Sequence, residues 1–119
     1  MKFAAPVVSY MRNFRDLRIW HDSIDLVVDV YHKTEALPRE EVYGITRQLR
    51  RSAVSTASNI VEGCSRSSQK DFRHFLEMSL GSTYESETQL VICNRLDFIR
   101  EEDLEGLLLK MHSLQSRIN

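Results

Sequence analysis

The stretch QLRRSAVSTASNIVEGCSR, residues 48–66, predicts a helix with almost no large side chains at its centre. Its middle is built from small residues, namely Ser52, Ala53, Ser55, Thr56, Ala57 and Ser58. Small side chains let the backbone of another helix approach closely, and hydroxyl groups inside such a contact must then find hydrogen-bond partners. We therefore interpret this stretch as the crowded central helix of a small bundle.

Apolar residues at helical spacing predict three further helices around this one. We expect the four helices to cover about residues 16–35, 45–62, 69–96 and 101–118. Ser67 or Ser68 is expected to cap the third helix, and Gly63 is expected to end the second in the left-handed conformation. Short connections between four helices predict an all-α, antiparallel up-down-up-down four-helix bundle. The bundle is expected to span residues 14–119, after an N-terminal tail of residues 1–13.

Composition excludes several classes of protein. The formal net charge of −1 gives no overall attraction to nucleic acid or to a membrane surface. The two cysteines are far apart, and no secretory leader is recognisable, so we expect reduced thiols and a cytoplasmic location. No apolar run is long enough to predict a membrane span.

The sequence contains no motif that indicates a catalytic, metal-binding or phosphate-binding site. The four histidines lack the paired spacing of a metal site, and the serines lack the surroundings of a catalytic nucleophile. No glycine-rich phosphate loop occurs either. We therefore expect no catalytic residue, no metal, no cofactor and no enzymatic activity.

Polar residues share one face of the second helix and are expected to form an internal hydrogen-bond network, which Glu85 of the third helix would join. The second-helix members are Gln48, Ser52, Ser55, Asn59 and Glu62. Ligand binding is the alternative role for this set. We favour a structural role, because buried polar groups are normally satisfied within the protein.

The first helix carries two apolar stripes and therefore needs two partners. One stripe contains Leu17, Trp20, Ile24, Val27, Val28 and Tyr31, and the other contains Ile19, Leu26 and Val30. We expect a neighbouring subunit to cover the second of these stripes.

The motifs together resemble one protein family. They are F-x-x-L-x-x-W from Phe14, QLRR from Gln48, NIVEG from Asn59, and Gly81-Ser82 followed by Glu85 and TQL from Thr88. This combination resembles the bacterial four-helix-bundle proteins first noticed in intervening sequences of 23S ribosomal RNA genes. The resemblance covers residues from about Phe14 to the C-terminus.

That resemblance implies a four-helix bundle that assembles as a ring, a pentamer in related proteins, with a poorly defined molecular function. A related branch, the accessory protein of diversity-generating retroelements, binds nucleic acid and partners a reverse transcriptase. That branch is strongly basic and this chain is not, so the intervening-sequence branch is favoured. Ser86 departs from the family pattern, which has an apolar residue there.

The placement of charge suggests a function. Residues 47–73 carry six basic and two acidic groups, whereas residues 74–105 carry two basic and eight acidic groups. Folding the chain up-down-up-down should gather one set of cations at one end of the bundle: Arg12, Arg15, Arg18, Arg66, Lys70, Arg73, Lys110 and Arg117. Repeated around a ring, such an end is expected to bind the phosphates of structured RNA or DNA in a salt-sensitive way. The alternatives are a protein–protein interaction module, and cations that only solvate helix ends.

Overall fold

Four helices form an elongated bundle in the computed structural model, which describes residues 12–119. The helices are α1 (Arg18–Thr34), α2 (Ile45–Cys64), α3 (Gln69–Arg95) and α4 (Glu101–Ile118). Single turns of 3-10 helix, η1 (Phe14–Asp16) and η2 (Arg39–Glu41), precede α1 and α2. The whole measures 52 × 29 × 19 Å. Residues 1–11 of the expected tail lie outside the described residues.

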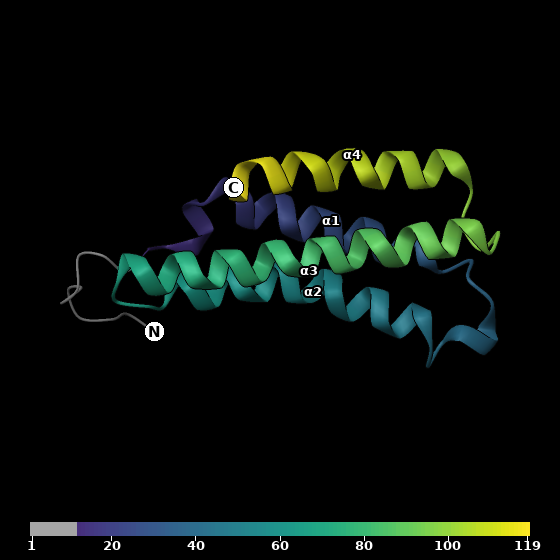
Figure 1. Ribbon diagram of the computed structural model, residues 1–119, viewed down its shortest axis with the longest axis horizontal. Helices are drawn as coiled ribbons and strands as arrows, with labels where there is room; N and C mark the ends of the chain where they lie inside the picture. The colour runs from purple at the N-terminus through teal and green to yellow at the C-terminus, as the bar shows by residue number, and fades with distance from the viewer. Residues whose placement is uncertain (1–11) are drawn as a thin grey trace.

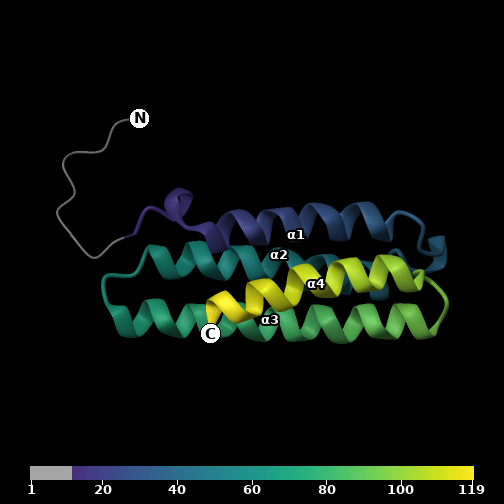
Figure 2. The same cartoon turned by 90° about the horizontal axis from the view of Figure 1, so that it is seen from above.

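Each helix packs against two neighbours: α1 and α3 each lie against both α2 and α4. Figures 1 and 2 show the four helices running up and down in turn, so the predicted antiparallel four-helix bundle is confirmed. The core between them is aliphatic, with Leu49 of α2, Leu90 of α3 and Leu107 of α4 completely buried. Burying such a leucine side chain stabilises the fold by about 1.5–3 kcal/mol.

The helix ends follow the local sequence. Ser68 caps α3, because its Oγ accepts a hydrogen bond from the backbone N–H of Asp71 at 3.1 Å. Three acidic residues fill the first turn of α4, where the positive end of the helix dipole favours them. Asp97 adopts a left-handed conformation (φ 63°) after α3, and the N–H of Phe98 bonds to the carbonyl of Cys93 at 2.8 Å. That pattern is a Schellman ending with aspartate in the position that glycine usually takes.

The seam between α2 and α3 is as close as the small residues of α2 predicted. Ser79 of α3 donates a hydrogen bond from Oγ to the backbone carbonyl of Thr56 at 2.7 Å, so one helix reaches the backbone of the other. Gly63 was expected to end α2 in the left-handed conformation, and that prediction is wrong. It lies inside the helix, where a Cβ would stand 3.0 Å from Cβ of Phe75 and 3.3 Å from the carbonyl oxygen of Phe72. Glycine is needed there for close packing of α3.

Gly81, in contrast to Gly63, has no close neighbour on any of the other described helices. It lies in the middle of α3, and no atom of the described chain comes within 4 Å of the place its Cβ would occupy. Gly81 is therefore not packed closely against another helix within residues 12–119. A glycine inside a helix costs about 1 kcal/mol relative to alanine, and packing among the described residues does not explain this one.

Gly63→Ala is expected to lower the free energy of unfolding. Overpacking a tight contact costs about 1–3 kcal/mol, which offsets or exceeds the gain of about 1 kcal/mol in helix propensity. Gly106→Ala in α4 is the matched control, because open space surrounds that position, and it should raise the free energy of unfolding by about 0.5–1 kcal/mol. Urea unfolding of the two variants tests this. Equal stabilisation of both variants would show that α3 can shift away from α2 to make room for the added methyl group.

Candidate nucleic-acid interface

A cluster of cations, which we call the hairpin end, surrounds the connection between α2 and α3. Arg66 lies in the connection, Lys70 and Arg73 lie at the start of α3, and Arg12, which precedes η1, reaches Gln69 and Phe72 of α3. The hairpin of α2 and α3 projects beyond the C-terminus of α4 (Figures 1 and 2). The hairpin projects because α3 is longer than α4: α3 has 27 residues and α4 has 18.

Two arginines of the hairpin end are held on aromatic rings. The guanidinium carbon of Arg12 lies 3.9 Å from the ring centroid of Phe72, and its Nη2 donates a hydrogen bond to Oε1 of Gln69 at 2.8 Å. The guanidinium carbon of Arg66 lies 4.6 Å from the ring centroid of Phe75. Arg66 also pairs with Glu62, one turn earlier, at 3.5 Å. These stacks hold positive charge against α3 and cover ring faces that nucleobases would otherwise need for stacking.

The other two cations of the hairpin end, Lys70 and Arg73, have no carboxylate partner in the described part of the chain. Lys70 and Arg73 are exposed on the first turns of α3, and among residues 12–119 neither forms an ion pair. They line a shallow depression of about 410 Å³ together with Gln69, His74 and Glu77. Unpaired cations around a depression can accept phosphate oxygens without first breaking an internal ion pair.

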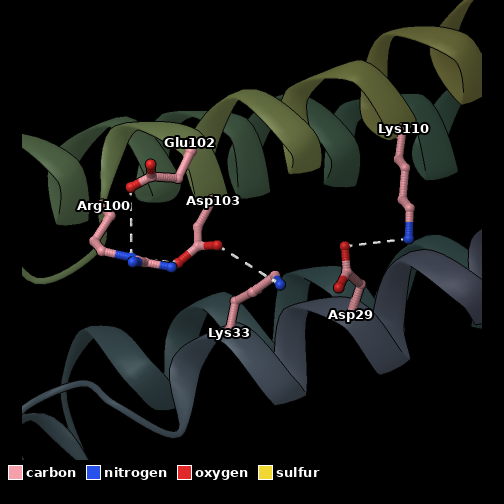
Figure 3. Close-up of polar contacts among 6 residues, drawn as sticks. All are labelled: Asp29, Lys33, Arg100, Glu102, Asp103 and Lys110. Atoms are coloured by element: carbon pink, nitrogen blue, oxygen red, sulfur yellow. Dashed lines mark hydrogen bonds and ion pairs between the residues drawn. The ribbon is translucent and has the colours of Figure 1, made fainter.

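Three of the eight predicted cations lie elsewhere. Lys110 of α4 pairs with Asp29 of α1 at 3.2 Å, as Figure 3 shows. Arg117 pairs with Asp22 of α1, which Arg18 also approaches at 3.9 Å. These residues form the seam between α1 and α4, so the expectation that they join one basic end is wrong. The cause is the length of α4, which stops short of the hairpin end.

The same seam continues toward the start of α4. Lys33 of α1 lies 3.6 Å from Asp103, which Arg100 also approaches at 3.4 Å, and Arg100 reaches Glu102 at 3.6 Å (Figure 3). Arg15, the remaining predicted cation, is exposed on η1 and lies near the rings of Phe14 and Trp20. The structure thus reduces the predicted basic end from eight residues to the four of the hairpin end, with Arg15 nearby in sequence.

The polar network exists, but only part of the predicted set belongs to it. Ser52 is buried, and its hydroxyl contacts the hydroxyl of Ser86 at 2.6 Å and donates to Oε1 of Gln89 at 2.8 Å. Ser55 accepts from Ser82 at 3.1 Å and from Asn59 at 3.1 Å.

Gln48 and Glu85 are exposed and do not contribute, and Glu62 turns outward to Arg66. The sequence prediction missed the α3 half of the network. A row of polar residues on the otherwise apolar face of α3 was the signal: Ser79, Ser82, Ser86 and Gln89.

The residues expected at a subunit interface lie instead in the core of the chain. Leu26 and Val30 are fully buried by α2 and α4, and Ile19 is partly buried against the same cluster. That prediction is wrong, because this stripe faces inward. The other apolar stripe of α1 faces outward, with Ile24 and Val28 exposed.

The comparisons with known proteins agree with this architecture. The family model described as 23S rRNA-intervening sequence protein matches residues 15–119. The chain belongs to this family. A crystal structure of a protein of unknown function from the S23 ribosomal protein family of Bacteroides thetaiotaomicron has the same fold, with a TM-score of 0.78. It is 23% identical and is matched over 84% of this chain and 94% of that chain. No sequence among the curated proteins matches the chain.

At that identity the similarity of the two structures establishes the fold alone. Neither the description of the family nor that of the structural neighbour names an enzymatic activity. Ser86, where the family resemblance implies an apolar residue, is completely buried. The hydroxyl of Ser86 lies 2.6 Å from the hydroxyl of Ser52, so it has a hydrogen-bond partner although it is buried.

The two cysteine thiols are buried and are not activated as nucleophiles. Burial raises the pKa of the Cys64 thiol, although the charge of Arg12 acts in the opposite direction. Burial also raises the pKa of the Cys93 thiol, and Glu41 adds to that effect. A raised pKa disfavours the thiolate, which is the nucleophilic form. The histidines are exposed, and no group of three or more metal-ligating side chains is found within residues 12–119.

None of the helices in the described part of the chain combines the length and the apolar character needed to cross a membrane.

Proposed function

We propose that this chain is a non-enzymatic, oligomeric scaffold of the cytoplasm, which binds structured RNA or DNA through the hairpin end. The observation that carries the proposal is that Lys70 and Arg73 form no ion pair with any of the residues 12–119, and that they lie beside two arginines held on aromatic rings. The cations of the α1–α4 seam, by contrast, have internal carboxylate partners.

The chemistry of the hairpin end favours phosphate over base recognition. Each phosphate contact releases counterions, so binding weakens steeply with salt. The rings of Phe72 and Phe75 already carry the guanidinium groups of Arg12 and Arg66. Stacking of bases is therefore a minor contribution, and little sequence preference is expected. Several hairpin ends in one assembly would raise the affinity through multivalency.

The double variant Lys70→Glu/Arg73→Glu is expected to bind a labelled structured RNA at least tenfold more weakly than the unchanged chain at low salt. Fluorescence anisotropy at two salt concentrations measures this, with duplex DNA as a second probe. The matched control is Arg39→Glu/Arg95→Glu, which changes the net charge equally at exposed sites. Arg39 begins η2 and Arg95 ends α3, so both lie away from the connection between α2 and α3. Light scattering first establishes that both variants keep the mass of the unchanged chain.

Loss of binding in the first variant alone supports the hairpin end as the binding site. Equal loss in both variants would mean that affinity follows total charge. No binding of the unchanged chain at low salt would overturn the proposal and favour the alternative, a protein–protein interaction module. The apolar side chains exposed on α1 and α2 are the observation that favours this alternative.

A further inference from the structure

A second cluster of cations lies at the start of α2, away from the hairpin end. Arg47, Arg50 and Arg51 line a depression of about 560 Å³ between α1 and α2, which we call the arginine pocket. Its other lining residues include Tyr31, Val42, Thr46 and Val54, and no acidic side chain lines it. The three arginines lie in the first two turns of α2, whereas the hairpin end follows the last turn, so the two clusters are separate.

The placement of these arginines costs stability within the chain. Arg47 is the third residue of α2, where the positive end of the helix dipole disfavours a cation. Arg47 and Arg51 are one turn apart, at a spacing where like charges repel each other. Both are exposed, and neither forms an ion pair with any of the residues 12–119. A bound anion would relieve both repulsions.

Glu41 is the acidic residue closest in sequence to these arginines, and it does not neutralise them. Its Oε1 would stand 2.8 Å from a Cβ at Gly44, so its carboxylate lies beside the residue that precedes α2. Glu41 does not line the arginine pocket, and it forms no ion pair within the described chain.

Arg50 is held in place before any ligand binds. Its Nε donates a hydrogen bond to Oγ1 of Thr34 at 3.0 Å, and its guanidinium carbon lies 4.5 Å from the ring centroid of Tyr31. A guanidinium group has five N–H donors, so it can bind an oxyanion while one of them is engaged. Because Arg50 is already ordered, binding through it costs little further side-chain freedom.

Thr46 supplies a second, independent indication of a ligand. It lines the arginine pocket and is only 5% exposed. Its Oγ1 is the one buried side-chain oxygen or nitrogen in the described part of the chain that has no hydrogen-bond partner. Such a group is costly to bury, and a threonine hydroxyl can donate to an oxygen of a bound anion.

Apolar side chains complete the pocket. Val42 and Val54 are exposed at 47% and 40%, beside the arginines. An inorganic ion would not contact them to advantage, because they offer no hydrogen bond or charge. They favour a ligand in which an apolar body is joined to the anionic group.

We propose that the arginine pocket binds a phosphate monoester, a small molecule whose phosphate group is attached to an apolar or aromatic body. The three arginines and the hydroxyl of Thr46 would hold the phosphate, and the body would pack on Val42 and Val54. A phosphate monoester carries a charge of about −1.5 to −2 at pH 7 and has three strong acceptor oxygens. It therefore matches three cations and a hydroxyl better than a carboxylate does, which has one charge and two oxygens.

Phenyl phosphate is the probe that tests the pocket, and isothermal titration calorimetry of the full chain at low salt measures its binding. One molecule should bind per chain. It should bind about fivefold more tightly than inorganic phosphate, because its ring buries apolar surface. Affinity for phenyl phosphate no greater than that for inorganic phosphate would contradict the apolar part of the site.

The variant Arg47→Gln/Arg51→Gln should bind phenyl phosphate about tenfold more weakly or worse, because two charge-assisted contacts are lost. The matched control is Arg15→Gln/Arg95→Gln, which removes the same charge at exposed positions outside the pocket and should bind as the unchanged chain does. Light scattering verifies that both variants keep the mass of the unchanged chain.

Thr46→Val separates a ligand-binding hydroxyl from one that is only buried. Valine has nearly the same shape and no donor, so we expect about threefold weaker binding of phenyl phosphate. The melting temperature should not fall, because the hydroxyl has no partner to lose among the described residues. Unchanged affinity would remove Thr46 from the site.

Two results would overturn the proposal outright: no binding of phenyl phosphate by the unchanged chain, or equal loss in the control. A labelled RNA that displaces phenyl phosphate, and that binds Arg47→Gln/Arg51→Gln more weakly, would also overturn it. The pocket would then be part of a nucleic-acid surface. The variant Lys70→Glu/Arg73→Glu keeps the two proposals apart, since it should lose RNA and still bind phenyl phosphate.

Discussion

Val30→Asp is expected to unfold the chain, whereas Val28→Asp on the same helix should leave it folded. Val30 is 0% exposed and belongs to the aliphatic core, whereas Val28 is 47% exposed. A carboxylate at position 30 would lie among apolar side chains without a partner, and a buried unpaired charge costs several kcal/mol. That loss approaches the whole stability of a typical domain, which is about 5–15 kcal/mol.

Thermal unfolding followed by circular dichroism measures the difference. We expect Val30→Asp to show little cooperative transition, and Val28→Asp to melt within a few degrees of the unchanged chain. A folded Val30→Asp variant with reduced mass would contradict the structure and would return residue 30 to a subunit interface.

The choice between the two apolar stripes of α1 could not be made from the sequence. The outward stripe contains larger apolar residues, including Trp20, Ile24 and Tyr31. The inward stripe includes two polar residues, Ser23 and Thr34, which are fully or almost fully buried. Their hydroxyls bond to carbonyls of their own helix, to Trp20 at 2.6 Å and to Val30 at 2.7 Å. Hydroxyls satisfied locally can occupy a core position, so polarity alone does not identify the exposed face.

The number of helices and most of their boundaries were predictable, because they depend on local signals. Ser68 as a cap, the acidic run from Glu101 and the run of small residues in α2 each act within a few residues. The basic end was harder to predict, because it depends on how far α4 extends beside α3. That register is set by packing, and it pairs Lys110 with Asp29 instead of leaving it at the end of the bundle.

Ser86→Leu is expected to destabilise the bundle by about 2–6 kcal/mol, although it places an apolar residue at a buried position. Ser86 is completely buried in the seam between α2 and α3. A leucine there must displace neighbouring atoms, at a cost of about 1–3 kcal/mol. It would also disturb the hydrogen bond between Ser52 and Gln89, and a buried polar group left unpaired costs about 1–3 kcal/mol more.

Ser86→Ala separates these two effects. Alanine fits the space and removes only one contact of Ser52, whose single hydroxyl hydrogen can still be donated to the carbonyl of Leu49 at 3.0 Å or to Oε1 of Gln89 at 2.8 Å. We expect a loss of about 0.5–1.5 kcal/mol, the usual net value of one hydrogen bond. Urea unfolding measures both variants. A leucine variant as stable as the alanine variant would show that α2 and α3 can move apart. Close packing of the two helices would then not be the reason for a small polar residue at position 86.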